Sequence, residues 1–212
     1  MSATARPPFR AEHIGSLLRP EKLKEAFKKA SAGKIGDEEF GAVQDAAIME
    51  VVKLQEDVGL KVVTDGEFRR PSYWAHFVNK VEGMGIAPAL FKFHDEHGHE
   101  TGFTTPTVIG QVRRTQGIST NEFDFLKNVT SATPKITMPS APTMHFWRGK
   151  STFAPGTYTD LRAFFADLAK VYQEEIKALH QLGCRYVQID EVPLAALCDP
   201  KVRSRVAADG QD

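Results

Sequence analysis

Two pairs of acidic residues follow short apolar runs in this 212-residue sequence. Asp65 and Glu67 flank a glycine directly after the first run, and Asp190 and Glu191 directly follow the second. Carboxylates that gather at the ends of neighbouring strands suit an ammonium group or a metal ion. Acids in such loops also cap or pair locally within a turn, so one pair alone does not distinguish a site from a turn.

A third segment combines a glycine with a hydroxyl group. Ile14, Gly15 and Ser16 follow a short strand that we expect around His13. Glycine lets a ligand approach the backbone, and successive N–H groups can hold a carboxylate. An ordinary tight turn has the same composition, so the spacing alone leaves both interpretations open.

The elements before the two acid pairs are of the same kind and in the same order. Each pair is preceded by an amphipathic helix with one apolar stripe, then a glycine, then a β-branched strand. Strands that alternate with helices predict parallel β/α units, in which side chains at the carboxyl ends of the strands carry the chemistry. The two series are residues 37–58, Gly59 and 60–64, and residues 161–179, Gly183 and 186–189.

The predicted fold class is α/β, a (β/α) TIM-type barrel with about half of its eight strands. Strands are expected near His13, Val62, Ile136 and Val187, whereas a closed barrel needs eight strands and typically about 250 residues. We expect one domain over residues 1–212. An open half barrel exposes strand edges and apolar helix faces, which permits self-association.

The region between the second and third expected strands breaks this pattern. Residues 80–133 contain many glycines, prolines and histidines, with short β-like runs such as residues 104–112. This composition predicts a β-hairpin excursion from the barrel.

The bulk composition excludes several kinds of partner. Lys+Arg and Asp+Glu both number 27, so the net charge is zero, and neither nucleic acid nor an anionic membrane is an expected partner. Residues 1–10 have no apolar stretch, and no later apolar run reaches the length of a bilayer span. Cys184 and Cys198 do not make a disulfide framework, so we expect a cytoplasmic protein.

Metal ligands are sparse in the sequence. His94, His97 and His99 lie among acids and could bind a metal, but an exposed polar turn explains them better. Cys184 and Cys198 have no Cys or His at ligand spacing, and we interpret them as packing residues. We therefore expect no metal site within this chain.

Three motifs together resemble the vitamin B12-independent methionine synthase family, in particular the single-barrel relatives of its catalytic domain. They are His-Ile-Gly-Ser-Leu-Leu-Arg-Pro at residues 13–20, Val-Thr-Asp-Gly-Glu-Phe-Arg-Arg at 63–70 and Gln-Ile-Asp-Glu at 188–191. The resemblance runs in order over nearly the whole chain. It implies an S-methyltransferase that passes a methyl group from a methylated folate to homocysteine, giving methionine without cobalamin.

The resemblance also implies roles for five residues in substrate binding. Ile14, Gly15 and Ser16 would hold the homocysteine carboxylate through backbone and hydroxyl groups. Glu67 and Asp190 would hold its amino group. These roles agree with the chemistry of the residues, because N–H donors suit an anion and carboxylates suit a cation.

In the family, zinc holds the homocysteine thiol as thiolate, which is the nucleophile. The resemblance places its ligands in a His-x-Cys motif after the next strand and in a later Glu and Cys. This sequence contains no His-x-Cys, so we expect these ligands beyond Asp212 and no activity from this chain alone. The alternatives are a related barrel that alkylates another thiol and a non-catalytic substrate-binding fragment, which would fold without metal.

Overall fold

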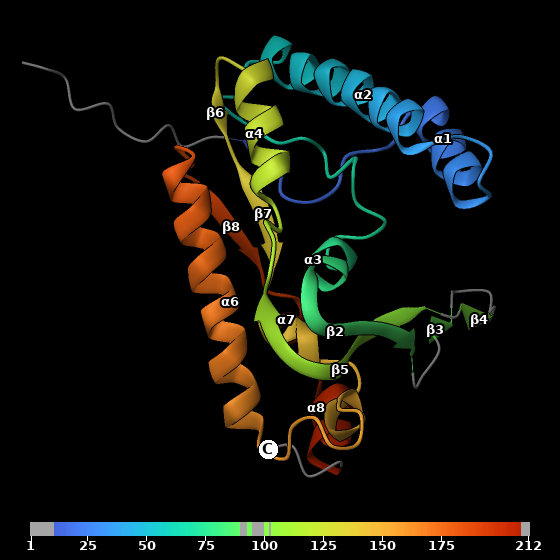
Figure 1. Ribbon diagram of the computed structural model, residues 1–212, viewed down its shortest axis with the longest axis vertical. Coiled ribbons are helices and arrows are strands. Elements are labelled where there is room, and N and C mark those ends of the chain that lie inside the picture. Colours follow the sequence, from blue (N-terminus) through green and yellow to red (C-terminus); the bar gives the residue numbers. More distant parts are fainter. Residues whose placement is uncertain (1–10, 90–92, 95–99, 102, 209–212) are drawn as a thin grey trace, which may run out of the picture. The chain divides into compact units, whose positions relative to one another are not determined.

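The computed structural model describes residues 11–89, 93–94, 100–101 and 103–208 (Figure 1). The chain divides into two compact units. Unit 1 consists of Met1–Arg69, Glu122–Ile136 and Cys184–Tyr186; unit 2 consists of Arg70–Asn121, Thr137–Gly183 and Val187–Asp212.

Unit 1 contains two consecutive helices near its N-terminus. Helix α1 covers Glu21–Ser31. Helix α2 covers Asp37–Asp57, as the apolar spacing of residues 37–58 predicted. The first turn of α2 carries only acids among its charged residues, which favours the positive end of the helix. Gly59 ends α2 with a φ of 87°, a conformation that glycine adopts without strain. The hydrophobic core cluster of the unit includes Leu23, Ala47, Ile48, Val51, Val52, Val63, Phe68 and Leu126.

The strands of unit 1 are short and parallel. Strand β1 (Val62–Val63) pairs with β6 (Thr133–Pro134), with Val62 opposite Thr133. Helix α4 (Thr120–Val129) precedes β6 and places Leu126 in the core of unit 1.

The strand expected around His13 is absent, so this part of the prediction is wrong. Residues 11–14 lie in irregular backbone. The His13 carbonyl accepts a hydrogen bond from the Lys135 ammonium at 2.6 Å. A side chain distant in sequence thus takes the place of a strand partner, and local sequence patterns do not reveal such a donor.

An antiparallel hairpin forms one side of unit 2. Strand β2 (Val81–Pro88) pairs with β5 (Thr104–Arg114), and β3 (Phe93–His94) pairs with β4 (Glu100–Thr101). Helix α3 (Ala75–Lys80) leads into β2. The hairpin lies within the range where an excursion was expected, whereas α4, in the same range, was not foreseen.

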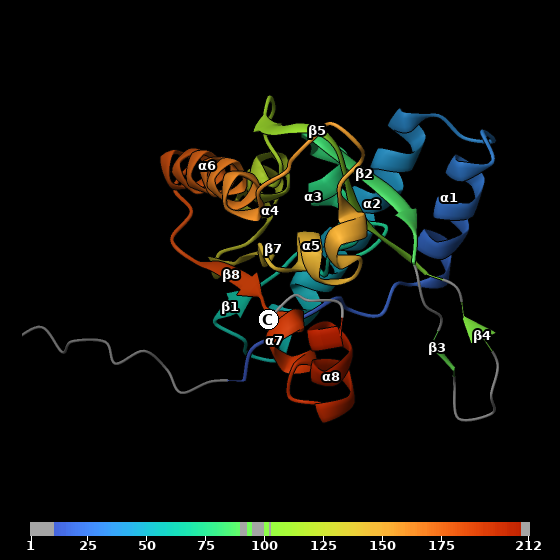
Figure 2. The same cartoon turned by 90° about the horizontal axis from the view of Figure 1, so that it is seen from below.

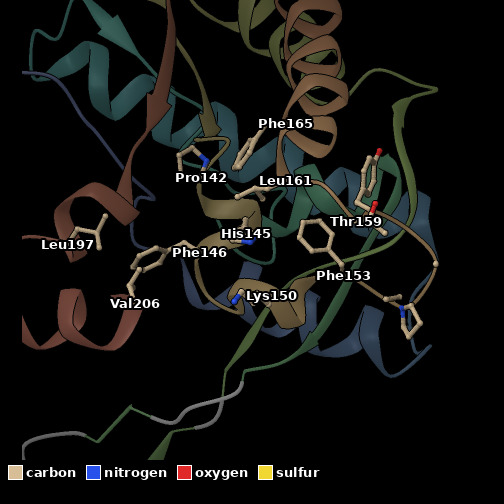
Figure 3. Close-up of a pocket in the computed structure, with 14 residues that line it drawn as sticks. Pro142, His145, Phe146, Lys150, Phe153, Thr159, Leu161, Phe165, Leu197 and Val206 are labelled. Atoms are coloured by element: carbon tan, nitrogen blue, oxygen red, sulfur yellow. The ribbon is translucent and has the colours of Figure 1, made fainter. Parts of the chain in front are cut away.

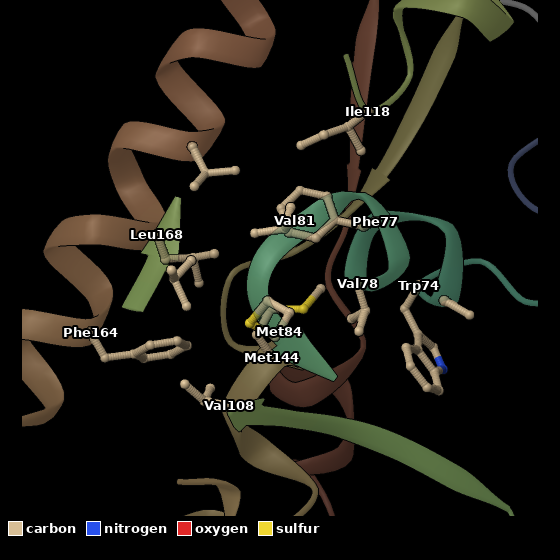
Figure 4. Packing of buried hydrophobic residues seen from close by; sticks show 13 residues of the cluster. Trp74, Phe77, Val78, Val81, Met84, Val108, Ile118, Met144, Phe164 and Leu168 are labelled. Atoms are coloured by element: carbon tan, nitrogen blue, oxygen red, sulfur yellow. The ribbon is translucent and has the colours of Figure 1, made fainter. Parts of the chain in front are cut away.

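Helix α6 (Leu161–Gln181) packs against β5 in unit 2 (Figures 1 and 2). Asp160 caps it by accepting a hydrogen bond from the Arg162 N–H at 2.9 Å. Between these elements lies an apolar core (Figure 4), whose fully buried members include Phe77, Val108, Ile118, Met144, Phe164 and Leu168.

The strands expected near Ile136 and Val187 are both present and pair with each other. Strand β7 (Ile136–Pro139) pairs with β8 (Val187–Asp190). The Ile136 N–H donates to the Tyr186 carbonyl, and the Ser140 N–H donates to the Asp190 carbonyl. Both strands therefore advance four residues in the same direction, so the pair is parallel. The short helices of unit 2 are α5 (Thr143–Phe146), the 3-10 helix η1 (Gly149–Thr152), α7 (Val192–Ala196) and α8 (Pro200–Ala208).

The α/β class is confirmed, since helices alternate with short strands and two strand pairs run parallel. The described strands form four two-stranded sheets and do not close into a barrel. Within the described residues, no helix has the length and apolar character that crossing a bilayer requires.

Candidate functional site

The turn after strand β1 is fixed by its own side chains. Thr64 Oγ1 accepts a hydrogen bond from the Gly66 N–H at 3.1 Å, and Asp65 Oδ1 accepts one from the Glu67 N–H at 2.9 Å. Gly66 and Glu67 both have left-handed backbone, with φ of 68° and 59°. Asp65 thus accepts a hydrogen bond within its own turn through one carboxylate oxygen.

Glu67 combines burial with an unfavourable backbone conformation. Glu67 is only 1% exposed. Among the described non-glycine residues, it is the one with a positive φ. A non-glycine residue in a sparsely populated region costs on the order of 1 kcal/mol and persists only where its surroundings enforce it. Such strain is concentrated at functional sites, which makes the Glu67 carboxylate a strong candidate.

The loop of residues 14–16 contacts this turn. The Ser16 hydroxyl donates a hydrogen bond to the Glu67 carboxylate, joining two motifs that are 51 residues apart. The Leu17 N–H donates to the Gly66 carbonyl at 3.1 Å, and Arg19 donates to the Glu67 carbonyl at 3.3 Å. Two of the five predicted residues therefore meet in unit 1.

Ile14 and Gly15 lie at the exposed side of the same loop. Ile14 is 66% exposed, and a Cβ added to Gly15 would meet no heavy atom within 4 Å. The space beside Gly15 is accordingly open, which leaves room for a ligand at this position.

A buried lysine that sequence reasoning overlooked lies behind the loop. The Lys135 side chain is 0% exposed, and its Nζ is 3.3 Å from the Glu12 carboxylate and 2.6 Å from the His13 carbonyl. The signal in the sequence was a lysine directly before the buried strand β7.

Asp190 belongs to unit 2, so its membership of one site with Ser16 and Glu67 remains a prediction. It is half-buried, and its carboxylate accepts a hydrogen bond from Gln188 Nε2 at 2.6 Å. The neighbouring Glu191 caps helix α7, accepting from the Leu194 N–H at 3.1 Å. The second acid pair is thus divided between a candidate ligand and a helix cap.

The described part of the chain offers no group of three or more His, Cys, Asp or Glu residues that could hold a metal ion. Cys184 is buried, and this burial raises the pKa of its thiol, as expected for a packing residue. Cys198 is exposed and donates to the Leu194 carbonyl. His97 and His99 lie outside the described residues. The described residues do not fit a zinc site.

A pocket of about 690 Å³ lies in unit 2 (Figure 3). Its walls combine aromatic and aliphatic side chains, and His145 and Lys150 supply its basic groups. Burial lowers the pKa of His145, which favours the neutral imidazole. The sequence analysis did not predict this pocket, although closely spaced aromatics were a signal. The lining residues include Phe146, Phe153, Tyr158, Thr159, Leu161, Phe165, Leu197 and Val206.

Residues 9–208 match a family model described as the catalytic domain of cobalamin-independent synthase. The chain belongs to this family. It is 37% identical to the uncharacterized protein YxjH of Bacillus subtilis, over 97% of this chain and 54% of YxjH. It is 30% identical to the methionine synthase of Sulfolobus acidocaldarius, over 84% of this chain and 50% of that protein. The chain thus spans about half the length of these relatives.

Solved structures show the same family relationship. A putative vitamin B12-independent methionine synthase from Listeria monocytogenes superimposes with a TM-score of 0.72 at 32% identity, over 91% of this chain and 54% of that one. A B12-independent methionine synthase from Shewanella, solved in complex with selenomethionine, gives a TM-score of 0.60 at 25% identity, over 74% and 44% of the two chains. Membership of the cobalamin-independent synthases is therefore established by sequence and by structure.

Proposed function

We propose that this chain supplies the amino-acid-binding part of an S-methyltransferase that passes a methyl group from a methylated folate to homocysteine, giving methionine. The observation that carries the proposal is the hydrogen bond from Ser16 to Glu67, which joins two of the three family motifs within unit 1. Family membership and the relatives named methionine synthase support it.

The chemistry of the substrate matches the proposed residues. Homocysteine and methionine both carry a carboxylate and an ammonium group. The backbone of Ile14 and Gly15, together with the Ser16 hydroxyl, supplies donors for the carboxylate. Glu67 and Asp190 supply carboxylates for the ammonium group. The Shewanella relative holds selenomethionine, an amino acid of the same chemistry.

The Ser16–Glu67 contact suggests how substrate enters. An ammonium group that binds Glu67 would take the position of the Ser16 hydroxyl, because that hydroxyl now donates to the carboxylate. The released hydroxyl can then donate to the substrate carboxylate. The backbone N–H groups of Ile14 and Gly15 lie next to Ser16 in the sequence, so all three donors can reach the substrate carboxylate. With the ammonium group on Glu67, the amino acid is held by both of its charged groups.

In this proposal zinc, when bound, would hold the substrate thiol as a thiolate nucleophile. Because the described residues do not fit a zinc site, we assign its ligands to residues outside the described ones. The methyl donor is proposed to occupy the pocket of unit 2, where aromatic walls suit a flat ring and Lys150 suits an anionic tail.

The half-barrel architecture, a cytoplasmic location and self-association are further parts of the proposal. Ile189 on β8 and Leu194 on α7 are 45% and 64% exposed. Apolar side chains at a strand and its following helix favour association with another surface. Light scattering across a concentration series would show a rising mass if the chain self-associates and a constant monomer mass if it does not.

Calorimetric titration with L-methionine and L-homocysteine tests the proposal, with 3-(methylthio)propylamine as the matched control because it lacks the carboxylate. We expect both amino acids to bind and the amine to bind more weakly. The same preparation, supplied with homocysteine, methylated folate and zinc, should form no methionine and retain less than one zinc per chain after dialysis. Absence of amino-acid binding would contradict the proposed site, and turnover with one tightly held zinc would contradict the assignment of the ligands.

The methyl-transfer step is tested in a chimera. This chain would replace the matching 50% of the methionine synthase of Sulfolobus acidocaldarius, and methionine formation would be assayed with homocysteine and methylated folate. An active chimera that loses activity on Glu67→Gln supports the proposal. A chimera that folds and binds zinc, but forms no methionine even with Glu67 intact, contradicts it.

A further inference from the structure

We propose that Lys135 is a positioning residue that sets the direction of the Ile14 amide in the loop that receives the substrate carboxylate. This inference rests on the proposed function, and it adds a residue that lies in none of the three motifs.

The ammonium group of Lys135 is fully removed from water and must therefore be paired within unit 1. Its side chain is 0% exposed, and its Nζ donates to the His13 carbonyl at 2.6 Å. The Glu12 carboxylate lies 3.3 Å from the same atom. A buried charge that loses such partners is strongly destabilising, so the arrangement resists change.

Tyr186 completes this cluster. Its hydroxyl donates to Glu12 Oε1 at 2.9 Å, and its ring centroid lies 5.4 Å from Lys135 Nζ. Glu12 is thereby held from two sides, and the backbone that follows it is held by the lysine. All of these residues belong to unit 1.

Peptide geometry transmits this restraint to the ligand-binding loop. The carbonyl of His13 and the N–H of Ile14 belong to one peptide unit, which is planar and trans. The two groups point in opposite directions, so a hydrogen bond that fixes the carbonyl also fixes the amide. Lys135 therefore directs the Ile14 N–H away from itself.

The loop is held at its other end by the turn after β1. The Leu17 N–H donates to the Gly66 carbonyl at 3.1 Å, and the Ser16 hydroxyl donates to Glu67. At Gly15, by contrast, the space beside the backbone is open. These contacts at the two ends hold the loop in place before a ligand binds, which reduces the entropy cost of binding.

Lys135→Met tests this inference, since it removes the charge and leaves a side chain of similar length. Titrations would compare L-methionine with 3-(methylthio)propylamine, which lacks only the carboxylate. We expect Lys135→Met to weaken L-methionine binding about tenfold or more and to leave the amine unchanged. The Ile14 amide resonance, followed by ¹⁵N NMR, should shift in the same variant.

The double variant Glu12→Gln/Lys135→Met separates positioning from stability. A neutral pair can replace a buried ion pair without loss of stability, so this variant should recover the melting temperature but not the affinity for L-methionine. It also carries the test if Lys135→Met alone does not fold.

Two results would overturn the inference. Either a folded Lys135→Met variant binds L-methionine as tightly as the unaltered chain, or the double variant recovers both stability and affinity. If the unaltered chain binds no L-methionine at all, the proposed function fails and this inference fails with it. The titration of the unaltered chain thus separates the two failures.

Discussion

The two strand ends that carry paired acids arise from the same sequence pattern and differ in their surroundings. After β1, Asp65 and Glu67 are 4% and 1% exposed, and the backbone turns through a left-handed conformation. After β8, Asp190 is half-buried, and Glu191 begins helix α7 as its cap.

The residues that follow each strand explain this difference. Gly66 permits a left-handed turn, which brings Glu67 to the Ser16 hydroxyl. At the second strand end, Pro193 lies in the first turn of a helix, and Glu191 is used to satisfy the Leu194 N–H. A repeated pattern of strand and acids therefore fixes where carboxylates lie, whereas the next few residues decide what each carboxylate can do.

Gly66→Ala should have the largest effect on the first turn. An added Cβ would lie 2.9 Å from the Phe68 ring and 3.2 Å from the Leu17 Cβ, at a φ of 68°. Strain and overpacking together should lower the free energy of unfolding by about 2–5 kcal/mol, as measured by urea denaturation.

Gly15→Ala is the matched control, because its Cβ would enter open space. Its free energy of unfolding should change by less than about 1 kcal/mol. Equal destabilisation by the two substitutions would show that the first turn is not the restrained element that the structure indicates.

Glu67→Gln and Glu191→Gln compare the two acid pairs directly. Removing the Glu67 carboxylate from an ammonium contact should weaken L-methionine binding by about 1.5–3 kcal/mol. Glu191→Gln should leave the affinity unchanged, since Glu191 serves helix α7. Calorimetric titration measures both, and the assignment of roles is wrong if the Glu191 variant loses more affinity than the Glu67 variant.

The smallest expected effect concerns Tyr172, which links the second acid pair to alkaline stability. Burial, and then the charge of Glu191, raise the pKa of Tyr172 above its ordinary value of 10.0. The folded chain therefore keeps this proton at a pH where the unfolded chain releases it. The contribution of Tyr172 to the free energy of unfolding is therefore fully present below pH 10. It decreases as the pH rises further, by at most about 1.4 kcal/mol per pH unit.

Unfolding free energies at pH 9 and pH 11 check this expectation. The decrease should be smaller in Tyr172→Phe than in the unaltered chain. An identical decrease in the two proteins would refute the link between Tyr172 and alkaline stability.

Regular periodicity made the long helices predictable. Helix α2 was expected over residues 37–58 and is observed over Asp37–Asp57; α6 was expected over residues 161–179 and is observed over Leu161–Gln181. The prediction of a strand near His13 was wrong. The His13 carbonyl accepts a hydrogen bond from the side chain of Lys135, which lies 122 residues away in the sequence.

The candidate site was harder to predict from local sequence patterns than the helices were. The motifs nominated Ser16 and Glu67, but the burial of Glu67 and its positive φ depend on tertiary structure. The pocket in unit 2 combines residues from α5, α6 and α8, so its aromatic walls come together only on folding.

The most direct test of the proposed amino-acid site is an ¹⁵N NMR titration of this chain with L-methionine. The proposal predicts that the largest shift changes occur at the amides of Ile14, Gly15 and Glu67, and that Glu67→Gln weakens them. Binding that leaves these three amides unchanged, or no binding at millimolar L-methionine, would contradict it.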